Sequence, residues 1–273
     1  MLTGIRVLDL TQEAGFLAGK ILGDLGADVV KVEPPGGDRA GRRGPYLGDV
    51  EDPERSLLWL ALNTSKRGIS LDLGRERGRE VYRRLAQRAD AVLETAEPGA
   101  LAELGIDYES LRADNPRLVQ CALTPFGRSG PYAAYRAHDL VAVAMGGNAA
   151  LTGDPDRPPV RCTLPTAYYH AGPEAALGIA MALFAREASG RGQFVDVSLR
   201  ETQLATLMTG PGQHARARRP RRRTGSITGR TREIWKAKDG GVSFALRGGQ
   251  HFLDQRRCFQ SHRISLLVDD CWL

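Results

Sequence analysis

The sequence predicts an α/β protein in which a doubly wound parallel sheet is followed by long linking helices and part of a second, smaller domain. Short apolar segments alternate with amphipathic segments from the N-terminus to about residue 125, the order typical of strands and helices in such a sheet. Beyond that point the chain has a long alanine-rich segment and fewer strand-like runs. Together these patterns indicate one large α/β domain and a change of architecture after it.

The first forty residues are the most informative part of the chain. A β-branched apolar run, a segment with apolar residues at helical spacing and a second apolar run predict a strand, a helix and a strand at residues 5–10, 14–25 and 29–32. Gly26 is the expected helix stop. Because so short a unit is a parallel crossover, a ligand is expected beyond the strand ends, at residues 11–15 and 33–38.

A nicotinamide dinucleotide is the obvious ligand to consider. Glu33 ends the second strand, where an acidic residue that binds ribose would stand. The first turn, however, lacks the G-x-G-x-x-G pattern and has only Gly15 and Gly19 near it. Without those glycines the backbone cannot approach a pyrophosphate closely. The sequence therefore favours a nucleotide-like ligand that is held in another way.

Composition narrows the class of protein. The chain has 273 residues, 42% of them hydrophobic, with no signal peptide and no apolar run of membrane-spanning length. Its four cysteines are scattered and contain no C-x-x-C pair, so neither zinc nor a disulfide framework is indicated. We expect a soluble cytoplasmic protein without a metal site or membrane partner.

The net charge of +6 has a local source in the basic segment 214–223. A solvated surface loop is the favoured interpretation. Nucleic acid is one alternative, but aromatic content is low and no reader helix is evident, so we expect no nucleic-acid partner. A loop near a phosphate-rich ligand is the other alternative.

The remaining elements of the large domain follow in order. We expect strands at residues 69–73, 90–94 and 116–123 and helices at 76–89, 98–105 and from 108 onward. Val81, Leu85 and Ala89 would form the buried face of the helix at 76–89, and Asp107 would cap the helix after it.

The later part of the chain is richer in helix. We expect helices at residues 139–150, 171–188 and 201–208, a strand at 194–199, and a β-hairpin over 234–246 that turns at Asp239-Gly240.

Several ordered motifs now add up to a resemblance. They are L-G-A-D-V-V-K-V-E-P with G-G-D, N-x-S-K-R-G-I-S-L-D-L, A-D-A-V-L-E with P-G-A-L, F-G-x-x-G-P, H-D, T-G-D-P-x-x-P-P-V and S-G-R-G-Q-F-V-D-V-S-L. In this order the chain resembles the class III CoA-transferases, the family of formyl-CoA transferase, carnitine CoA-transferase and α-methylacyl-CoA racemase. The resemblance runs from about residue 3 to about residue 249.

The resemblance implies a Rossmann-like CoA-binding domain, a CoA thioester as substrate rather than a resident cofactor, and an interlocked homodimer or a heteromer with a related subunit. It divides the chain into residues 1–200, the large domain with linker helices; 201–249, the start of the linker and small domain; and 250–273, a tail without a match. That tail favours a C-terminally truncated or frameshifted reading frame.

The resemblance also implies the chemistry. In the family an aspartate attacks the acyl-CoA thioester, a mixed anhydride and then an enzyme thioester form, and a carboxylic acid finally takes the CoA. Here Tyr168 stands at the position of that aspartate, just ahead of the expected long helix. A tyrosine hydroxyl, with its ordinary pKa near 10, is a poor replacement. Altered chemistry, a non-nucleophilic subunit of a heteromer and an inactive protein all remain open.

Two further candidates flank this position. The racemase branch uses a histidine at the position of His138 to move the α-proton. The transferases use an acid at the position of Asp139 to organise the site. The simpler interpretation of Asp139 is an N-cap of its own helix, and both roles could hold together. His170 and Glu174 are one helical turn apart, although a solvent-facing acid in a first turn is the favoured interpretation of Glu174.

For CoA itself the resemblance points to residues after the strands, namely Gln12, Ala14, Pro34, Leu71, Gly74, Thr95 and Ala96, and to Arg136. Basic residues near the same ends could meet the phosphates: Arg39, Arg42, Lys66 and Arg75. The family's glycine-rich loop would fall at residues 225–229.

Overall fold

The computed structural model describes residues 1–207 and 210–218, together with 222–223, 225, 227–228, 231–232, 234–236 and 240–243. The chain divides into two compact units, residues 1–148 with 162–209 and residues 149–161 with 210–273. The predicted tail 250–273 and residues 226 and 229 of the predicted glycine-rich loop lie outside the described residues.

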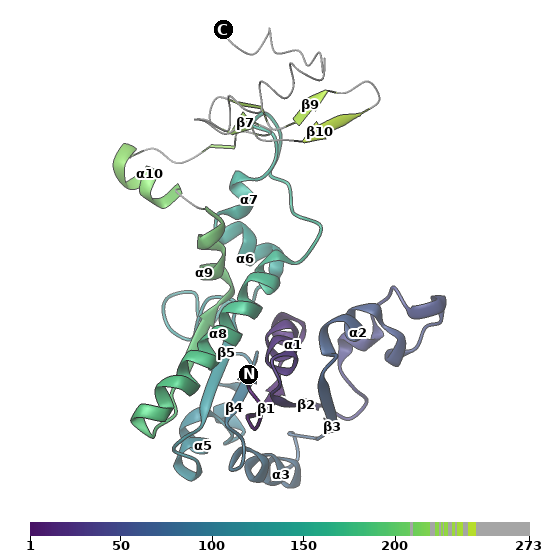
Figure 1. Ribbon diagram of the computed structural model, residues 1–273, viewed down its shortest axis with the longest axis vertical. Coiled ribbons are helices and arrows are strands. Elements are labelled where there is room, and N and C mark those ends of the chain that lie inside the picture. Colours follow the sequence, from purple (N-terminus) through teal and green to yellow (C-terminus); the bar gives the residue numbers. More distant parts are fainter. Residues whose placement is uncertain are drawn as a thin grey trace. The chain divides into compact units, whose positions relative to one another are not determined.

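The first unit contains a six-stranded parallel sheet in the order β3-β2-β1-β4-β5-β6 among the described residues (Figure 1). Its strands are β1 (Arg6–Leu10), β2 (Asp28–Glu33), β3 (Lys66–Ser70), β4 (Ala91–Glu94), β5 (Val119–Thr124) and β6 (Phe194–Ser198). The doubly wound parallel sheet predicted from the sequence is therefore confirmed.

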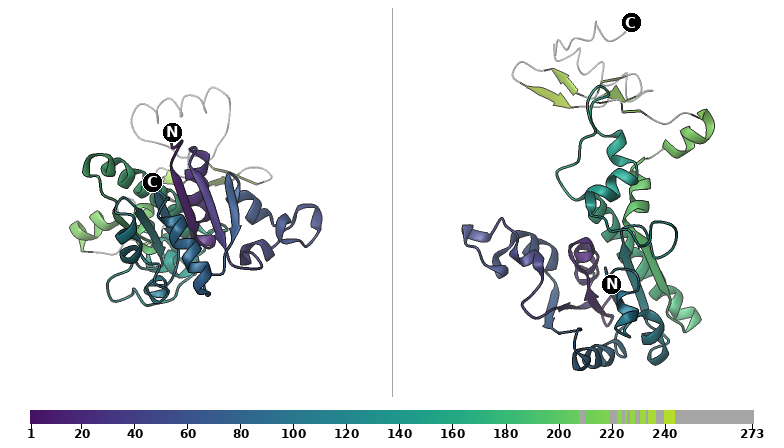
Figure 2. Two further views of the ribbon diagram at one scale, coloured as in Figure 1. Left: turned by 90° about the horizontal axis from the view of Figure 1, so that it is seen from below. Right: turned by 180° about the vertical axis from the view of Figure 1, so that it is seen from behind.

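Helices connect and cover these strands. They are α1 (Phe16–Asp24), α2 (Leu57–Asn63), α3 (Glu76–Ala86), α4 (Ala100–Glu103), α5 (Tyr108–Asp114), α6 (Asp139–Met145), α8 (Thr166–Ser189) and α9 (Leu199–Thr202), with 3-10 turns at Glu13–Gly15, Arg39–Arg42, Leu47–Asp49, Pro53–Arg55 and Gln203–Leu207. The helices α1 and α8 pack together on one face of the sheet, and α3 and α5 cover the other (Figures 1 and 2).

The core follows the strand alternation. Leu8, Val30 and Val92 point toward α3 and pack with Tyr82 in one apolar cluster. Their neighbours Asp9 and Lys31 point to the opposite face, toward Phe16 of α1. Val81, Leu85 and Ala89 were predicted to form the buried face of this helix. For Val81 the prediction is wrong: its side chain is 37% exposed, because Tyr82 lies on the face toward the sheet instead.

Other boundaries differ from the prediction. The third strand begins at Lys66 rather than residue 69, and α8 begins at Thr166 rather than residue 171. The helix predicted over 139–150 is split into α6 and α7 (Asn148–Leu151) at Gly147, whose φ of +91° does not continue a helix. Asp107 stands at the N-cap of α5, but its carboxylate accepts from the Ser110 hydroxyl instead of a backbone N–H.

In the second unit, α10 (Gly210–Ala217) covers the first part of the basic segment, which we predicted to be a loop. Arg223 is held against the same unit by three backbone carbonyls, those of Ala150, Asp154 and Arg157, at 2.9–3.1 Å. Short antiparallel pairs join β7 (Ile227–Thr228) to β8 (Thr231–Arg232), and β9 (Ile234–Lys236) to β10 (Gly241–Ser243). The second pair confirms the predicted hairpin; its turn residue Asp239 lies outside the described residues.

Across the part of the chain that the structure describes, no helix combines the length and apolar character needed to cross a bilayer.

Candidate functional site

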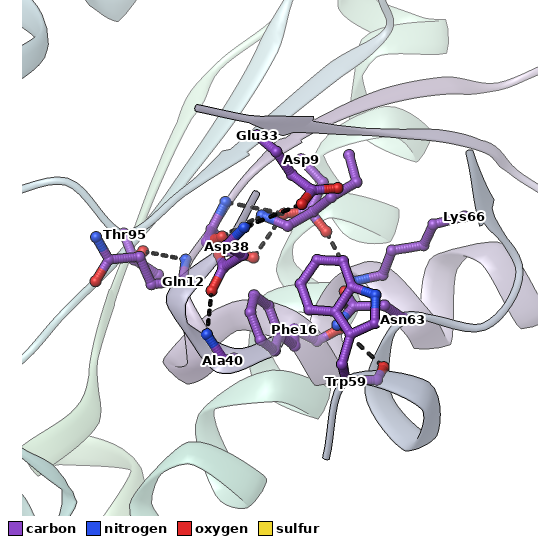
Figure 3. A network of polar contacts seen from close by, with 12 residues as sticks. Asp9, Gln12, Phe16, Glu33, Asp38, Ala40, Trp59, Asn63, Lys66 and Thr95 are labelled. Carbon is purple, nitrogen blue, oxygen red and sulfur yellow. Dashed lines mark hydrogen bonds and ion pairs between the residues drawn. The ribbon is translucent and has the colours of Figure 1, made fainter. Parts of the chain in front are cut away.

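The strand order places a topological switch point between β1 and β4. In doubly wound sheets, nucleotides bind beyond the carboxyl ends of the strands at such a point. The two loops are joined here, because the Gln12 N–H donates a 2.8 Å hydrogen bond to Thr95 Oγ1 (Figure 3). This edge of the sheet is therefore the candidate functional site.

The structure brings most of the predicted CoA contacts to this one edge. These residues follow the ends of four strands: Gln12 and Ala14 follow β1, Pro34 follows β2, Leu71 and Gly74 follow β3, and Thr95 and Ala96 follow β4. Arg136 lies in the segment before α6, where its Nε pairs with Glu97 Oε1 at 2.9 Å on the protein surface. Contact of these residues with CoA stays a prediction.

A buried group of charges lies directly behind the edge. The Asp9 side chain is fully buried and faces Lys31 of β2 and Lys66 of β3. Lys66 Nζ donates to Asp9 Oδ2 at 2.8 Å, to the Phe16 carbonyl at 3.0 Å and to Asn63 Oδ1 at 2.8 Å (Figure 3). Burial alone would raise the pKa of Asp9, but the two lysines outweigh it and hold that pKa below its usual value.

Lys66 therefore corrects a prediction. The sequence suggested that it could meet a CoA phosphate, but its ammonium is buried and uses all three donors inside the protein. Of the other predicted phosphate contacts, Arg42 donates to the Gly36 carbonyl at 3.1 Å, and Arg75 pairs with Asp72 while staying largely exposed. No local pattern indicates the partner of Lys66, because Asp9 lies far away along the chain.

Glu94 is a second buried carboxylate, and sequence reasoning missed its part in the site. It ends β4, accepts from the Ala96 N–H at 2.6 Å and pairs with the Arg128 guanidinium at 2.8 Å. Burial raises its pKa to about 7, although the Ala96 and Arg128 contacts act in the opposite direction. Arg128 also donates its backbone N–H to Asp196 at 2.8 Å, so Glu94 ties the Thr95–Ala96 turn to the loop after β5.

Tyr168 and Asp139 lie together where α6 and α8 begin. The Asp139 N–H donates to the Tyr168 phenol oxygen at 3.3 Å, and Asp139 Oδ1 accepts from the Ala167 N–H at 2.8 Å. Asp139 was predicted to cap its own helix; that prediction is wrong, because the N-cap of α6 is His138 and the Asp139 carboxylate caps α8 instead.

The environment of Tyr168 disfavours a phenolate. Tyr168 stands in the first turn of α8, not ahead of the helix as predicted, and its side chain is half-buried. Burial raises the pKa of the phenol, and the nearby carboxylates of Glu13 and Asp139 add to that shift. Arg43 acts against it but is itself paired with Glu13. Tyr168 is therefore a neutral phenol near pH 7.

The remaining candidates are on the surface. His138 is exposed and makes no side-chain cap bond to α6. His170 and Glu174 are also exposed, on the first turns of α8. The structure thus joins Asp139 to Tyr168 and leaves the side chain of His138 in solvent.

The parallel sheet and its strand order define the class as a doubly wound α/β protein, and comparison with known proteins identifies the family. The sequence model of CoA-transferase family III matches residues 2–267, further than residue 249, where the motif resemblance was expected to end. The chain belongs to CoA-transferase family III.

Curated proteins of similar sequence are also named as CoA-transferases. The chain is 45% identical over 202 residues to subunit BbsE of succinyl-CoA:(R)-benzylsuccinate CoA-transferase from Thauera aromatica, covering 74% of this chain and 49% of that relative. It is 32% identical over 274 residues to succinyl-CoA:glutarate CoA-transferase of Mus musculus, covering 99% and 61%. Among the first three relatives, it spans only about half of their length (49%, 52% and 56%).

Solved structures share the fold. A CAIB/BAIF family protein from Brucella suis is 34% identical with a TM-score of 0.83, covering 90% of this chain and 66% of that one. A hypothetical protein from Mycobacterium tuberculosis is 31% identical with a TM-score of 0.81, covering 98% and 71%.

Proposed function

We propose that this chain binds CoA thioesters and takes part in the transfer of CoA from an acyl-CoA to a carboxylic acid. In the overall reaction CoA moves from the acyl group of the donor to that of the acceptor: the donor thioester bond breaks and releases the donor as a carboxylate, and the acceptor carboxylate gives up one oxygen to it and becomes the new thioester. Membership of CoA-transferase family III supports this proposal. The convergence of Gln12, Thr95 and Ala96 at the switch point supports the place of CoA binding.

We further propose that this chain is the non-nucleophilic subunit of a heteromeric transferase. The single observation that carries this is Tyr168, which occupies the position expected for the nucleophilic aspartate. A carboxylate can form an activated acyl intermediate and leave again. A neutral phenol whose pKa is raised by burial is a poor nucleophile at pH 7. A related subunit would then supply the carboxylate, and the relative BbsE is itself named as a subunit.

In this proposal Asp139 and Tyr168 have a structural part. Asp139 ties the start of α8 to the start of α6 through the Ala167 N–H. Its own N–H is engaged with the Tyr168 hydroxyl, so the phenol serves as an acceptor within the protein. Racemisation is less well supported, because a two-base mechanism needs a base opposite His138, and Tyr168 does not supply one near neutral pH.

Calorimetric titration of the purified chain with free CoA tests the binding part. We expect a saturable interaction with a dissociation constant in the micromolar range, about the strength of ordinary substrate binding. Absence of any heat of binding up to millimolar CoA would refute this part. A Tyr168→Phe variant serves as the matched control, because it removes only the hydroxyl and should keep the affinity.

A further inference from the structure

The buried charges behind the site contain one residue that links two of the proposed CoA loops. Lys31 lies on β2 directly opposite Asp9 of β1 in the parallel register. Its side chain is 3% exposed. The ammonium lies 5.1 Å from the centre of the Phe16 ring, which adds a cation–π contact.

Asp9 takes its hydrogen bonds from groups other than Lys31, which acts on this carboxylate through its charge alone. One carboxylate oxygen accepts from both the N–H and the hydroxyl of Thr11, and the other accepts from Lys66. Lys31 Nζ lies 3.8 Å from Asp9, beyond ordinary hydrogen-bond length. Lys31 therefore adds an attraction to the hydrogen-bonded pair of Asp9 and Lys66, and it also has partners in two loops.

Those partners lie in the loops after β1 and β2. Lys31 donates a hydrogen bond to the carbonyl of Thr11, the residue that leads into Gln12 and Ala14. On the other side its ammonium lies 3.9 Å from Asp38 Oδ2. Asp38 in turn accepts from the Ala40 N–H at 2.8 Å and donates its own N–H to Glu33 at 3.1 Å (Figure 3). One ammonium therefore contacts both loops.

We propose that Lys31 is a positioning residue that holds the loops 11–15 and 36–42 in the conformation that binds CoA. Keeping a lysine ammonium in the interior costs free energy, and an apolar residue of similar volume often gives the folded protein equal or greater stability. What an apolar residue cannot supply is the bond to the Thr11 carbonyl and the attraction to Asp38. Holding a loop in its binding conformation before the ligand arrives raises affinity. This inference rests on the proposed function, since it assigns CoA as the ligand of these loops.

The test compares Lys31→Met with Lys20→Met. Lys20 lies on α1 and pairs with Asp24 away from the loops, so its variant controls for the loss of a lysine. Hydrogen exchange of the free protein is followed in residues 11–15 and 36–42, and free CoA is titrated by calorimetry. For Lys31→Met we expect faster exchange in both loops and about tenfold weaker CoA binding. Lys20→Met should match the wild type in both.

Unchanged exchange in both loops, or wild-type CoA affinity in Lys31→Met, would overturn the inference. If Lys31→Met does not fold, Asp38→Asn takes its place, because asparagine keeps an acceptor for Ala40 and loses the charge that faces Lys31. Faster exchange is then expected in residues 36–42 alone, since Lys31 still binds the Thr11 carbonyl, together with weaker CoA binding. Unchanged exchange in residues 36–42 or wild-type CoA affinity would overturn the inference. If the wild-type protein does not bind CoA, the proposed function fails, and loop exchange in the variant still decides the role of Lys31.

Discussion

Asp139 and Tyr168 exchange contacts across the starts of two helices. The backbone N–H of Asp139 donates to the Tyr168 phenol oxygen at 3.3 Å, while the Asp139 carboxylate accepts from Ala167, the neighbour of Tyr168, at 2.8 Å. The aspartate is 5% exposed. This arrangement joins α6 to α8 at the position where the proposed function expects the nucleophile of a family member that supplies one.

The first prediction concerns this junction. Asp139→Ala should lower the free energy of unfolding by about 1–2 kcal/mol, because α8 loses a side-chain cap on its first turn. Urea denaturation followed by circular dichroism measures the change. Asp107→Ala is the matched control, since Asp107 stands at the N-cap of α5 without capping its backbone. Equal losses in the two variants would contradict the role given to Asp139.

The second prediction concerns the buried pair of Asp9 and Lys66. Lys66→Met should destabilise the protein by about 3 kcal/mol, because Asp9 then keeps only Lys31, at 3.8 Å, as a cationic neighbour. The exposed pair of Lys20 and Asp24 provides the comparison: Lys20→Met should cost less than about 1 kcal/mol. Chemical denaturation of both variants measures the difference, and a cost for Lys66→Met as small as that for Lys20→Met would show that the buried pair is unimportant.

The third prediction concerns pH. Because burial raises the pKa of Glu94 from 4.5 to about 7, the folded protein keeps a proton that the unfolded chain releases. This contribution is present below pH 4.5 and is lost as pH rises through about 7. Its loss should lower the free energy of unfolding by up to about 3 kcal/mol between pH 4.5 and about 7.

Denaturation between pH 5 and about 8 checks this effect of Glu94. Glu94→Gln should flatten the dependence, because a glutamine does not titrate. Glu97→Gln, which changes an exposed acid three residues later, should leave the profile as in the wild type. Parallel profiles for wild type and Glu94→Gln would mean that Glu94 stays ionised throughout.

Much of the sheet could be predicted from the sequence because the signals are local. The apolar runs that became β1, β2, β4 and β5 are buried strands whose composition alone distinguishes them. The start of β3 was missed because Lys66 is charged; it pairs with Val29 of β2, and its buried charge is compensated by Asp9 of β1, far away along the chain. No periodicity in the segment itself carries this information.

The site was predicted less well for the same reason. The resemblance led to the strand ends and to Tyr168, and the structure brings the strand ends together. The resemblance did not indicate that Asp139 would cap α8, because its partner Ala167 lies beyond an intervening loop and helix. Glu94 resembles an ordinary strand end in the sequence, and its raised pKa arises from burial in the folded protein, which outweighs the opposing contacts with Ala96 and Arg128.

The central claim is that this chain binds CoA without supplying the nucleophile, and mass spectrometry of the intact protein incubated with succinyl-CoA tests it most directly. Under native conditions we predict a mass increase equal to one bound CoA species. After denaturation of the same sample we predict the unmodified mass, because no covalent intermediate forms. A covalent adduct on any residue of this chain, or the absence of a complex under native conditions, would contradict the account.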